Sequence, residues 1–326
     1  MLKVQTLKIC CLTYNLKEDT LSEQQLSELL SPHKDPSFDI YILSFQECER
    51  KTFINLFYSD KSALELKIVS FFPKTNYYNL TSITLGGIYL LIFIKNKHKN
   101  FVSDYSNNYI KTGFYGYLGN KGAVSIKFKI YDFTFIIINC HLKPGTDKFQ
   151  KRNDDIEYIF KNICEKMITN DILIWMGCFN FRVDATLGEF SNAYIKSKEM
   201  DLLQKDQIIK LRKEIDIDDN NILKELNEGK INFLPSSKYQ IGSNKIDWTN
   251  RNDYPGWTDR IFFKTFKSST SNFSLDLIEY NCMRDISFSD HKPIYAYFDF
   301  KIKKIIKTGI KVTKIVKYMY IKFILY

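Results

Sequence analysis

Short hydrophobic runs that end in polar side chains recur along the chain and predict buried strands. Runs of this form cover residues 8–15, 39–47, 88–94, 123–130, 133–139 and 172–175, and later runs cover 261–264, 275–280 and 294–300. Apolar residues at helical spacing predict helices over 21–30, 51–69 and 149–167, with a polar and largely helical segment over 184–230. Strands and helices mix without strict βαβ alternation. The pattern therefore predicts an α/β fold in which two mixed sheets pack together with helices outside.

Glycines punctuate two places in this pattern. Residues 113–122 predict a glycine-punctuated loop, and it precedes a hairpin-like pair of strands whose second member delivers Cys140 and His141. In the octet Trp175–Arg182, we expect Gly177 to let the backbone turn sharply, because glycine tolerates conformations closed to other residues. The polar groups after it would then emerge at the end of a strand, where sheet enzymes tend to keep their chemistry.

The composition indicates a large globular domain. The chain has 326 residues, is 44% hydrophobic and contains only 13 glycines and 7 prolines, so no long linker stands out. We predict one domain over residues 1–300 and a separate tail over 301–326. Seven cysteines, an odd number, and an N-terminus without a secretory signal favour a reducing, cytoplasmic location. No apolar run reaches 18 residues, so no membrane-spanning helix is expected.

The positive charge is concentrated in the tail. The whole chain carries +10, and residues 301–326 hold eight lysines and no acidic residue, which leaves +2 for residues 1–300. Isoleucines and aromatic residues alternate with these lysines at near-helical spacing. The tail therefore predicts peripheral binding to an anionic membrane, with a solvated or packed tail as the alternative. The nearly neutral body counts against a nucleic-acid partner.

Polar groups at the ends of the predicted strands suggest a metal and phosphate site. The candidates are Asn15, Glu47, His141, Asn180 and the pair Asp290-His291. Mg²⁺ takes oxygen ligands, usually one or two carboxylates with water and substrate phosphate, so Glu47 would be its main ligand and Asn15 would support it. The histidines and the amide would contact phosphate oxygens, and Asp259 or Asp290 could orient His291. Each of these residues alone could have a purely structural role, but their combination favours a metal-dependent phosphate site.

Seven motifs together resemble the inositol polyphosphate 5-phosphatases of the endonuclease/exonuclease/phosphatase superfamily. They are Thr13-Tyr14-Asn15, Gln46-Glu47, Gly119 to Val124, Asn139 to Leu142, Trp175 to Arg182, Pro255 to Ile261 and Ser289 to Pro293. The resemblance spans roughly residues 8 to 300. The loop from Gly119 and the Pro-x-Trp-x-Asp-Arg motif are its most family-specific parts.

This resemblance implies a deoxyribonuclease-I-like sandwich and Mg²⁺-dependent hydrolysis of the 5-phosphate of inositol polyphosphates or phosphoinositides. It implies that Glu47 and Asn15 hold the metal, and that His141, Asn180 and His291 contact the scissile phosphate. Asp259 would orient His291, and Asp290 would lie near the metal or the leaving group. The residues expected to bind the substrate or hold the site together are Asn120, Lys121, Arg152, Asn153, Lys238, Tyr239, Arg251 and Arg260.

Cys178 departs from this pattern, because the family has an Asp there that is taken to activate the attacking water. A thiol is mostly protonated at neutral pH, and the loss of a positioned general base typically costs ~10²–10⁴ in rate. Three interpretations remain open: an inactive inositide-binding pseudophosphatase or scaffold, a slow enzyme, or an enzyme in which another residue acts as the base. An abasic-site endonuclease would share the metal chemistry, but the near-neutral body disfavours it.

Overall fold

The computed structural model describes residues 2–48, 62–113, 118–164, 171–213, 221–249, 254–266 and 272–305. Arg251, the first part of the helix predicted from residue 51, and tail residues 306–326 lie outside these ranges. None of the helices that the structure describes is long and apolar enough to cross a membrane.

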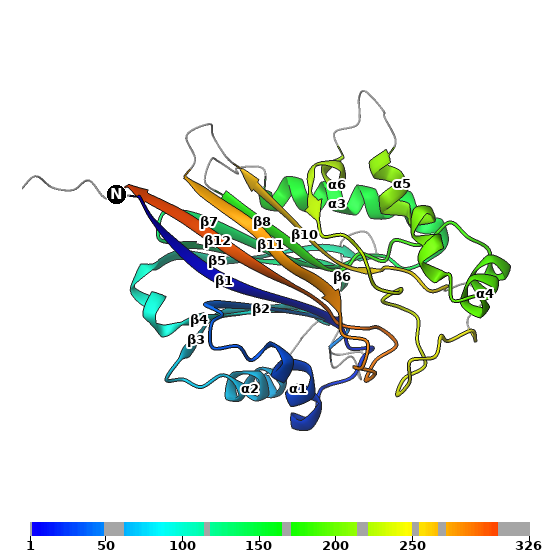
Figure 1. Ribbon diagram of the computed structural model, residues 1–326, viewed down its shortest axis with the longest axis horizontal. Helices are drawn as coiled ribbons and strands as arrows, with labels where there is room; N and C mark the ends of the chain where they lie inside the picture. Colours follow the sequence, from blue (N-terminus) through cyan, green and yellow to red (C-terminus); the bar gives the residue numbers. More distant parts are fainter. Residues whose placement is uncertain are drawn as a thin grey trace, which may run out of the picture.

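Two six-stranded sheets pack face to face, as the hydrophobic pattern predicts (Figure 1). The first sheet has the order β11-β12-β1-β2-β4-β3 and the second has the order β5-β6-β7-β8-β10-β9. The strands of the first sheet are β1 (Leu2–Asn15), β2 (Ile40–Gln46), β3 (Tyr77–Leu85), β4 (Ile88–Lys95), β11 (Phe273–Cys282) and β12 (Ile294–Ile305). Those of the second are β5 (Val102–Gly113), β6 (Leu118–Ile130), β7 (Phe133–His141), β8 (Asp171–Cys178), β9 (Asn227–Glu228) and β10 (Asp259–Phe266). Both sheets are mixed, because β1 and β2 run parallel, as do β7 and β8.

Helices cover the outer face of each sheet (Figure 1). The first sheet carries α1 (Glu23–Leu30) and α2 (Ser62–Phe71). The second carries α3 (Phe149–Cys164), α5 (Gln207–Lys213) and α6 (Ile222–Glu225), and α4 (Leu187–Ile195) lies farther along the molecule. Short 3₁₀ turns connect several elements: η1 (Ser31–His33), η3 (Asn96–Phe101), η5 (Thr146–Lys148) and η6 (Glu199–Lys205). The helix predicted to Met167 thus has its described end at Cys164.

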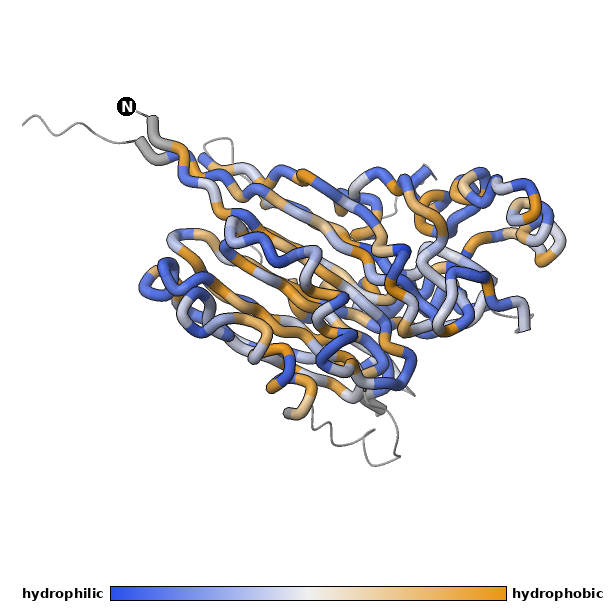
Figure 2. The backbone as a smooth tube through the Cα atoms, turned by 60° about the horizontal axis from the view of Figure 1, so that its bottom comes forward, coloured by the Kyte–Doolittle hydropathy of each residue, from blue (hydrophilic) through white to orange (hydrophobic). Residues whose placement is uncertain are grey.

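Three apolar layers hold these elements together. Alternate strand residues face the space between the sheets, such as Ile9 and Cys11, while Cys10 between them packs under α1 and α2. Cys10 and Cys11 therefore point to opposite faces, as expected for neighbours on one strand. The third layer lies between the second sheet and α3, α5 and α6. In Figure 2 the strands carry most of the hydrophobic colour and the connecting loops are largely hydrophilic.

Three features differ from the sequence prediction. Strand β5 was not predicted, because most of its residues are polar and exposed and its extended form depends on pairing with β6. Strand β6 begins at Leu118, so the second half of the predicted loop 113–122 belongs to the sheet. Strand β12 continues to Ile305 by pairing with the start of β1, so residues 301–305 of the predicted tail lie in the sheet.

Candidate active site

One end of the second sheet lines up three of the predicted site residues. His141, at the end of β7, pairs in register with Cys178 of β8, and Cys178 pairs with Asp259 at the start of β10. Strand β10 runs antiparallel to β8, so its first residue reaches the edge where β7 and β8 finish. The prediction that Asp290 and His291 follow a strand is wrong, because both precede β12. Asp259, for which no such prediction was made, is the first residue of β10.

Gly177 is required by close packing rather than by a turn. It lies inside β8 with φ +134°, and a Cβ atom there would meet the carbonyl oxygen of Cys140 at 2.1 Å and Asn139 Oδ1 at 2.9 Å. The sharp turn that the sequence analysis expected is thus absent at Gly177. The glycine instead lets β7 and β8 approach closely, which fixes the spacing between His141 and Cys178.

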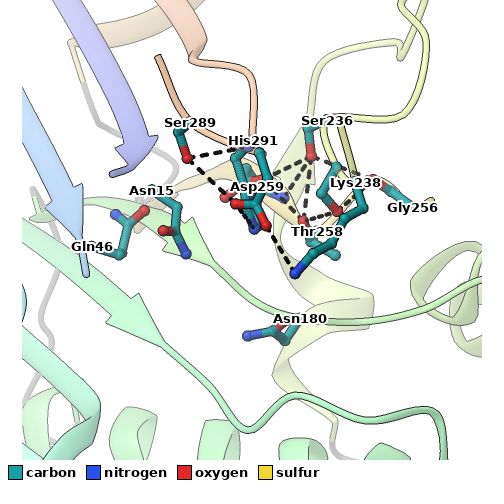
Figure 3. Close-up of polar contacts among 12 residues, drawn as sticks. Asn15, Gln46, Asn180, Ser236, Lys238, Gly256, Thr258, Asp259, Ser289 and His291 are labelled. Carbon is teal, nitrogen blue, oxygen red and sulfur yellow. Dashed lines mark hydrogen bonds and ion pairs between the residues drawn. The ribbon is translucent and has the colours of Figure 1, made fainter. Parts of the chain in front are cut away.

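A buried hydrogen-bonded pair, His291 and Asp259, occupies the centre of the site (Figure 3). Nδ1 of His291 lies 2.7 Å from Oδ2 of Asp259. An ionised carboxylate only accepts hydrogen bonds, so Nδ1 carries a proton and Nε2 is the nitrogen left for other contacts. Burial lowers the pKa of His291, but the carboxylates of Asp259 and Asp290 outweigh it and raise the pKa above its usual value.

The carboxylate of Asp259 is itself held by hydroxyl groups. Ser236 Oγ donates to Oδ2 at 2.8 Å and Thr258 Oγ1 donates to the same oxygen at 2.9 Å. With His291, three hydrogen bonds converge on Oδ2, whereas the buried Oδ1 has no hydrogen-bond partner among the described residues. The position of the imidazole is therefore set by a fully buried network that also leaves one carboxylate oxygen available.

Glu47 and His141 meet at the interface between the two sheets. Glu47 Oε1 lies 3.4 Å from His141 Nε2 and 3.8 Å from Lys121 Nζ, and Lys121 Nζ lies 2.6 Å from His141 Nε2. Glu47 has φ +52°, an uncommon backbone conformation for a residue with a side chain. Its backbone packs against Gly87, where an added Cβ would lie 3.1 Å from Glu47 Cα. The Gly86-Gly87 step thus permits the close approach that fixes Glu47.

The side chains of Glu47 and Asn15 fit a hard divalent cation by their chemistry. Asn15 pairs in register with Gln46 across the parallel strands β1 and β2, so Asn15 and Glu47 come from the ends of neighbouring strands. Asn15 Oδ1 accepts one hydrogen bond, from the backbone N–H of Lys17 at 3.0 Å, and a carbonyl oxygen has a second lone pair. One carboxylate and one amide oxygen are a donor set of the kind that Mg²⁺ uses together with water.

An amide bridge between the sheets lies beneath these residues. Gln46 Nε2 of β2 donates to Asn139 Oδ1 of β7 at 2.9 Å, and Asn139 Nδ2 donates to the carbonyl oxygens of Phe45 and Tyr89 at 2.9 and 2.8 Å. All of these atoms are buried. The bridge fixes the ends of β2 and β7 relative to each other, and these ends carry Glu47 and His141.

Asn180 and Asp290 complete the polar cluster. Asn180 Nδ2 donates to the carbonyl oxygen of Leu142 at 2.9 Å, and Arg182 Nη2 donates to Asn180 Oδ1 at 2.8 Å. Asp290 Oδ2 lies 2.9 Å from Lys238 Nζ and 3.0 Å from Lys17 Nζ. Burial acts to raise the pKa of Asp290, but His291, Lys238 and Lys17 lower it to about 2. Asn15, Asn180, Lys238 and His291 appear in the same region in Figure 3.

Cys178 is fully buried, and its thiol stays protonated at neutral pH. Burial raises its pKa well above the usual value, and the nearby negative charge of Asp259 raises it further. Lys121 and Arg182 oppose this shift without overcoming it. A neutral thiol is a poor acceptor for the proton of an attacking water, so Cys178 does not replace the expected carboxylate.

Several residues predicted to bind substrate are committed to the protein interior. Arg260 is fully buried, with a two-pronged ion pair to Glu228 and a 3.1 Å contact to Asp206 Oδ1. Arg152 is also fully buried and donates to Lys143 O, Gly145 O and Gln207 Oε1. The hydroxyl of Tyr239 donates to the carbonyl oxygen of Pro235. These three residues hold loops in place, because most of their polar atoms have partners away from solvent; Nε of Arg152 is buried without a hydrogen-bond partner among the described residues.

The remaining candidates differ in position. Lys121 is mostly buried beside His141 and Glu47. Asn120 precedes it, and its buried Oδ1 has no hydrogen-bond partner within the described part of the chain. Asn153 lies largely buried on α3, next to Arg152. Arg251 falls in the undescribed segment 250–253.

Sequence reasoning overlooked the residues that position the site. Four of these residues lie within the motifs of the sequence analysis, which could therefore have indicated them: Gln46, Asn139, Arg182 and Thr258. Ser236 and Lys17 had no such signal, because each contacts its partner only after the chain folds.

The chain is similar to proteins of one enzyme family over most of its length. The family model for Endonuclease/Exonuclease/phosphatase family 2 matches residues 12–297. Inositol polyphosphate 5-phosphatase K of Mus musculus is 29% identical over 300 residues, which cover 85% of this chain and 62% of that protein. The phosphatidylinositol 4,5-bisphosphate 5-phosphatase INP51 of Saccharomyces cerevisiae is 30% identical over 276 residues, 81% of this chain and 28% of that protein. The chain thus spans less than two thirds of the length of these relatives.

A solved structure has the same fold. It is the inositol polyphosphate 5-phosphatase domain of SPsynaptojanin, in complex with inositol (1,4)-bisphosphate and calcium ion. The two structures align with a TM-score of 0.75 at 26% sequence identity, covering 93% of this chain and 87% of that one. This likeness confirms the predicted deoxyribonuclease-I-like sandwich.

Proposed function

Because the chain belongs to the endonuclease/exonuclease/phosphatase family, and within it to the inositol polyphosphate 5-phosphatases, we propose that it hydrolyses the 5-phosphate of inositol polyphosphates or phosphoinositides. The observation that carries this proposal is the row His141, Cys178 and Asp259 across three neighbouring strands, with His291 bonded to Asp259 and Glu47 beside His141. The proposed site thus combines side chains from distant parts of the sequence, from Asn15 to His291, which are 276 positions apart.

We assign the metal ion to Glu47 and Asn15 and propose that it is Mg²⁺, because both donors are hard oxygens. When bound there, the ion supplies positive charge beside the phosphate oxygens. The imidazole of His291 donates from Nε2 to a phosphate oxygen, and Asp259 fixes its orientation through Nδ1. His141 and the amide of Asn180 contact the scissile phosphate from the β7 and β8 side.

The cationic side chains at the rim recognise the other phosphates of the inositol ring. Lys238 is the lysine of this group at the edge of the site and Lys121 lies deeper, beside His141; Asn120 can add hydrogen bonds only through its amide NH₂, because its oxygen is an acceptor. Asp290 holds Lys238 and Lys17 at about 3 Å, which keeps both ammonium groups at the edge of the site. Arg152, Tyr239 and Arg260 support this surface from the interior and do not touch substrate in this scheme.

Cys178 makes the proposed reaction slow. The attacking water has no carboxylate at position 178 to accept its proton, and the buried thiol is neutral. We expect Cys178→Asp to raise Mg²⁺-dependent phosphate release at least tenfold, because a positioned base typically contributes ~10²–10⁴ in rate. Lys121 and Arg182 favour a charged carboxylate at this position, whereas burial and the neighbouring Asp259 and Glu47 oppose it and keep the new carboxyl group more basic than a free one, as suits a general base.

The test is a phosphate-release assay over soluble inositol phosphates and phosphoinositide vesicles, with and without Mg²⁺. Cys178→Asn is the matched control, since it has the shape of Asp without the charge and should not raise the rate. The hydrolase proposal fails if the Asp variant keeps its fold, binds an inositide and still releases no phosphate. The two substrate arms separate a lipid headgroup from a free inositol phosphate.

A catalytically inactive inositide-binding module is the second candidate, and the buried neutral thiol of Cys178 favours it. This alternative predicts binding of an inositide by calorimetry without turnover in the wild-type chain. Its site would still need Lys121 and Lys238, so charge removal there should weaken binding. An absence of any inositide binding would eliminate it.

The lysine-rich segment 301–326 supports a second partner, an anionic membrane surface, for a cytoplasmic protein that binds membranes peripherally. Residues 306–326 contain five lysines, and each lysine near an anionic surface contributes ~1 kcal/mol. Cosedimentation with vesicles containing phosphatidylserine should therefore decrease when the chain is truncated after residue 305. Equal cosedimentation of the full and truncated chains would contradict this assignment.

A further inference from the structure

Beside the oxygen ligands of Glu47 and Asn15, the site contains a second group of ligand atoms of a different chemical kind. One atom each from Cys178, Asp259 and His291 lies within 4.8 Å of the other two. The three side chains are buried, and only His291 has measurable exposure, at 8%. From this cluster we propose that Cys178, Asp259 and His291 bind a soft or borderline divalent cation of the Zn²⁺ class.

The donor types select this class of ion. A sulfur, an imidazole nitrogen and a carboxylate oxygen are the ligands that Zn²⁺ takes in proteins, whereas Mg²⁺ avoids sulfur. With ligand bonds of about 2.0–2.3 Å, donors around a tetrahedral ion stand roughly 3.3–3.8 Å apart. Because the ligand atoms lie within 4.8 Å of one another, the widest pair would have to close by at most roughly 1–1.5 Å, which side-chain rotation can supply.

The carboxylate of Asp259 supplies an independent sign of a missing ligand. Its Oδ2 takes hydrogen bonds from His291, Ser236 and Thr258, whereas Oδ1 is buried and has no such partner among the described residues. A buried acceptor without a partner is costly, and a cation is one group that satisfies it. The residue is fully buried, so bulk water does not replace that partner.

Charge balance also suits a dication. On binding, the S–H bond of Cys178 breaks and sulfur keeps the electron pair as it bonds to the metal. His291 binds through Nε2 as the neutral imidazole, so any proton on Nε2 leaves to solvent together with the thiol proton, while Nδ1 keeps its hydrogen bond to Asp259. The thiolate and the Asp259 carboxylate then neutralise the two positive charges, and neutral sites are cheaper to bury than charged ones. The next charges are mixed in sign, with Glu47 negative and Lys121 and Arg182 positive. Cys178 is the sulfur ligand of the proposed Zn²⁺ site, so this site exists because a cysteine stands where the family pattern has an aspartate.

Co²⁺ is the probe, because a tetrahedral Co²⁺–thiolate site absorbs in the near ultraviolet and the visible. We expect the reduced, EDTA-treated full-length chain to develop thiolate-to-Co²⁺ absorption that saturates at one equivalent and disappears on addition of Zn²⁺. Cys178→Ser should lose this absorption. Cys164→Ser is the matched control, since Cys164 is also buried and free but lies at the end of α3, and it should keep the absorption.

His291→Ala provides a second variant if Cys178→Ser does not fold, and it should weaken Co²⁺ binding at least tenfold. A wild-type chain without thiolate absorption overturns the proposal, and so does absorption that survives in Cys178→Ser or an unchanged Co²⁺ affinity in His291→Ala. The readout is independent of phosphate release, so this proposal can fail while the hydrolase proposal stands, and the reverse also holds.

Discussion

Replacement of Arg260 by Met distinguishes a substrate-binding arginine from a structural one. The sequence motif left Arg260 either to bind substrate phosphate or to hold the site together, and the structure buries it between Glu228 and Asp206. Both carboxylates are almost completely buried. Burial raises the pKa of Asp206 even with Arg260 beside it, which shows how poorly this position tolerates an unpaired charge.

The expected cost follows from the partners that remain. Removing one member of a buried ion pair typically destabilises a protein by 3–5 kcal/mol, because the other member keeps its desolvation penalty. After the change, Glu228 retains Arg212 at 3.6 Å, and Asp206 retains backbone N–H groups from Ile208 and Ile209. We therefore expect a loss of about 3 kcal/mol, or a decrease in Tm of roughly 5 °C for a domain of about 300 residues.

Differential scanning calorimetry and steady-state kinetics should be measured on the same preparations. A structural Arg260 predicts a decreased Tm with a KM within about twofold of the wild type. The control is Lys264→Met on the same strand, because the exposed pair of Lys264 with Glu225 should contribute less than about 1 kcal/mol. The double variant Arg260→Met/Glu228→Met should recover part of the stability. An unchanged Tm with a KM raised tenfold or more would refute the structural assignment.

Three further changes test the supports of the fold and the site. Asp39 contacts His98, Lys97 and the backbone N–H of Lys8, and these contacts outweigh burial and lower its pKa to about 2. The stabilisation that the ionised carboxylate provides is therefore present above pH ~4 and is lost as the pH falls toward 2. Asp39→Asn should lower the free energy of unfolding in urea by about 1–2 kcal/mol at pH 7 and by almost nothing near pH 2, and an equal decrease at both pH values would contradict this. Asn139→Ala removes three buried hydrogen bonds between the sheets and should lower the free energy of unfolding by about 2–4 kcal/mol, although Gln46 Nε2 keeps Thr13 and Ser44 as acceptors; an unchanged urea midpoint would exclude a stabilising bridge. Gly177→Ala places a methyl group 2.1 Å from a carbonyl oxygen and should cost more than about 3 kcal/mol, while Gly188→Ala, with its nearest atom at 4.0 Å, is a control that should remain close to wild type in Tm.

From the sequence alone, most of the strands, the fold class and most residues of the candidate site could be predicted. Hydrophobic runs such as those of β7 and β8 are buried on both faces, so their composition alone marks them as central strands. The motifs likewise indicated His141, Asp259 and His291, because phosphate and metal chemistry requires side chains of these types. The polar edge strand β5 and the continuation of β12 to Ile305 were not predicted, since pairing with a neighbour makes them strands.

Which polar residues face the site and which face the interior depends on the tertiary structure and could not be predicted from the sequence. Arg260 and Asp259 are adjacent in the sequence, yet successive strand residues point to opposite faces, so one meets Glu228 and the other meets His291. The same holds for Cys178, whose thiol has no special reactivity in the sequence. The register of β8 with β10 places Cys178 beside Asp259, and the loop before β12 of the other sheet brings His291 to the same carboxylate. These two tertiary contacts account for both the neutral thiol and its place among metal ligands.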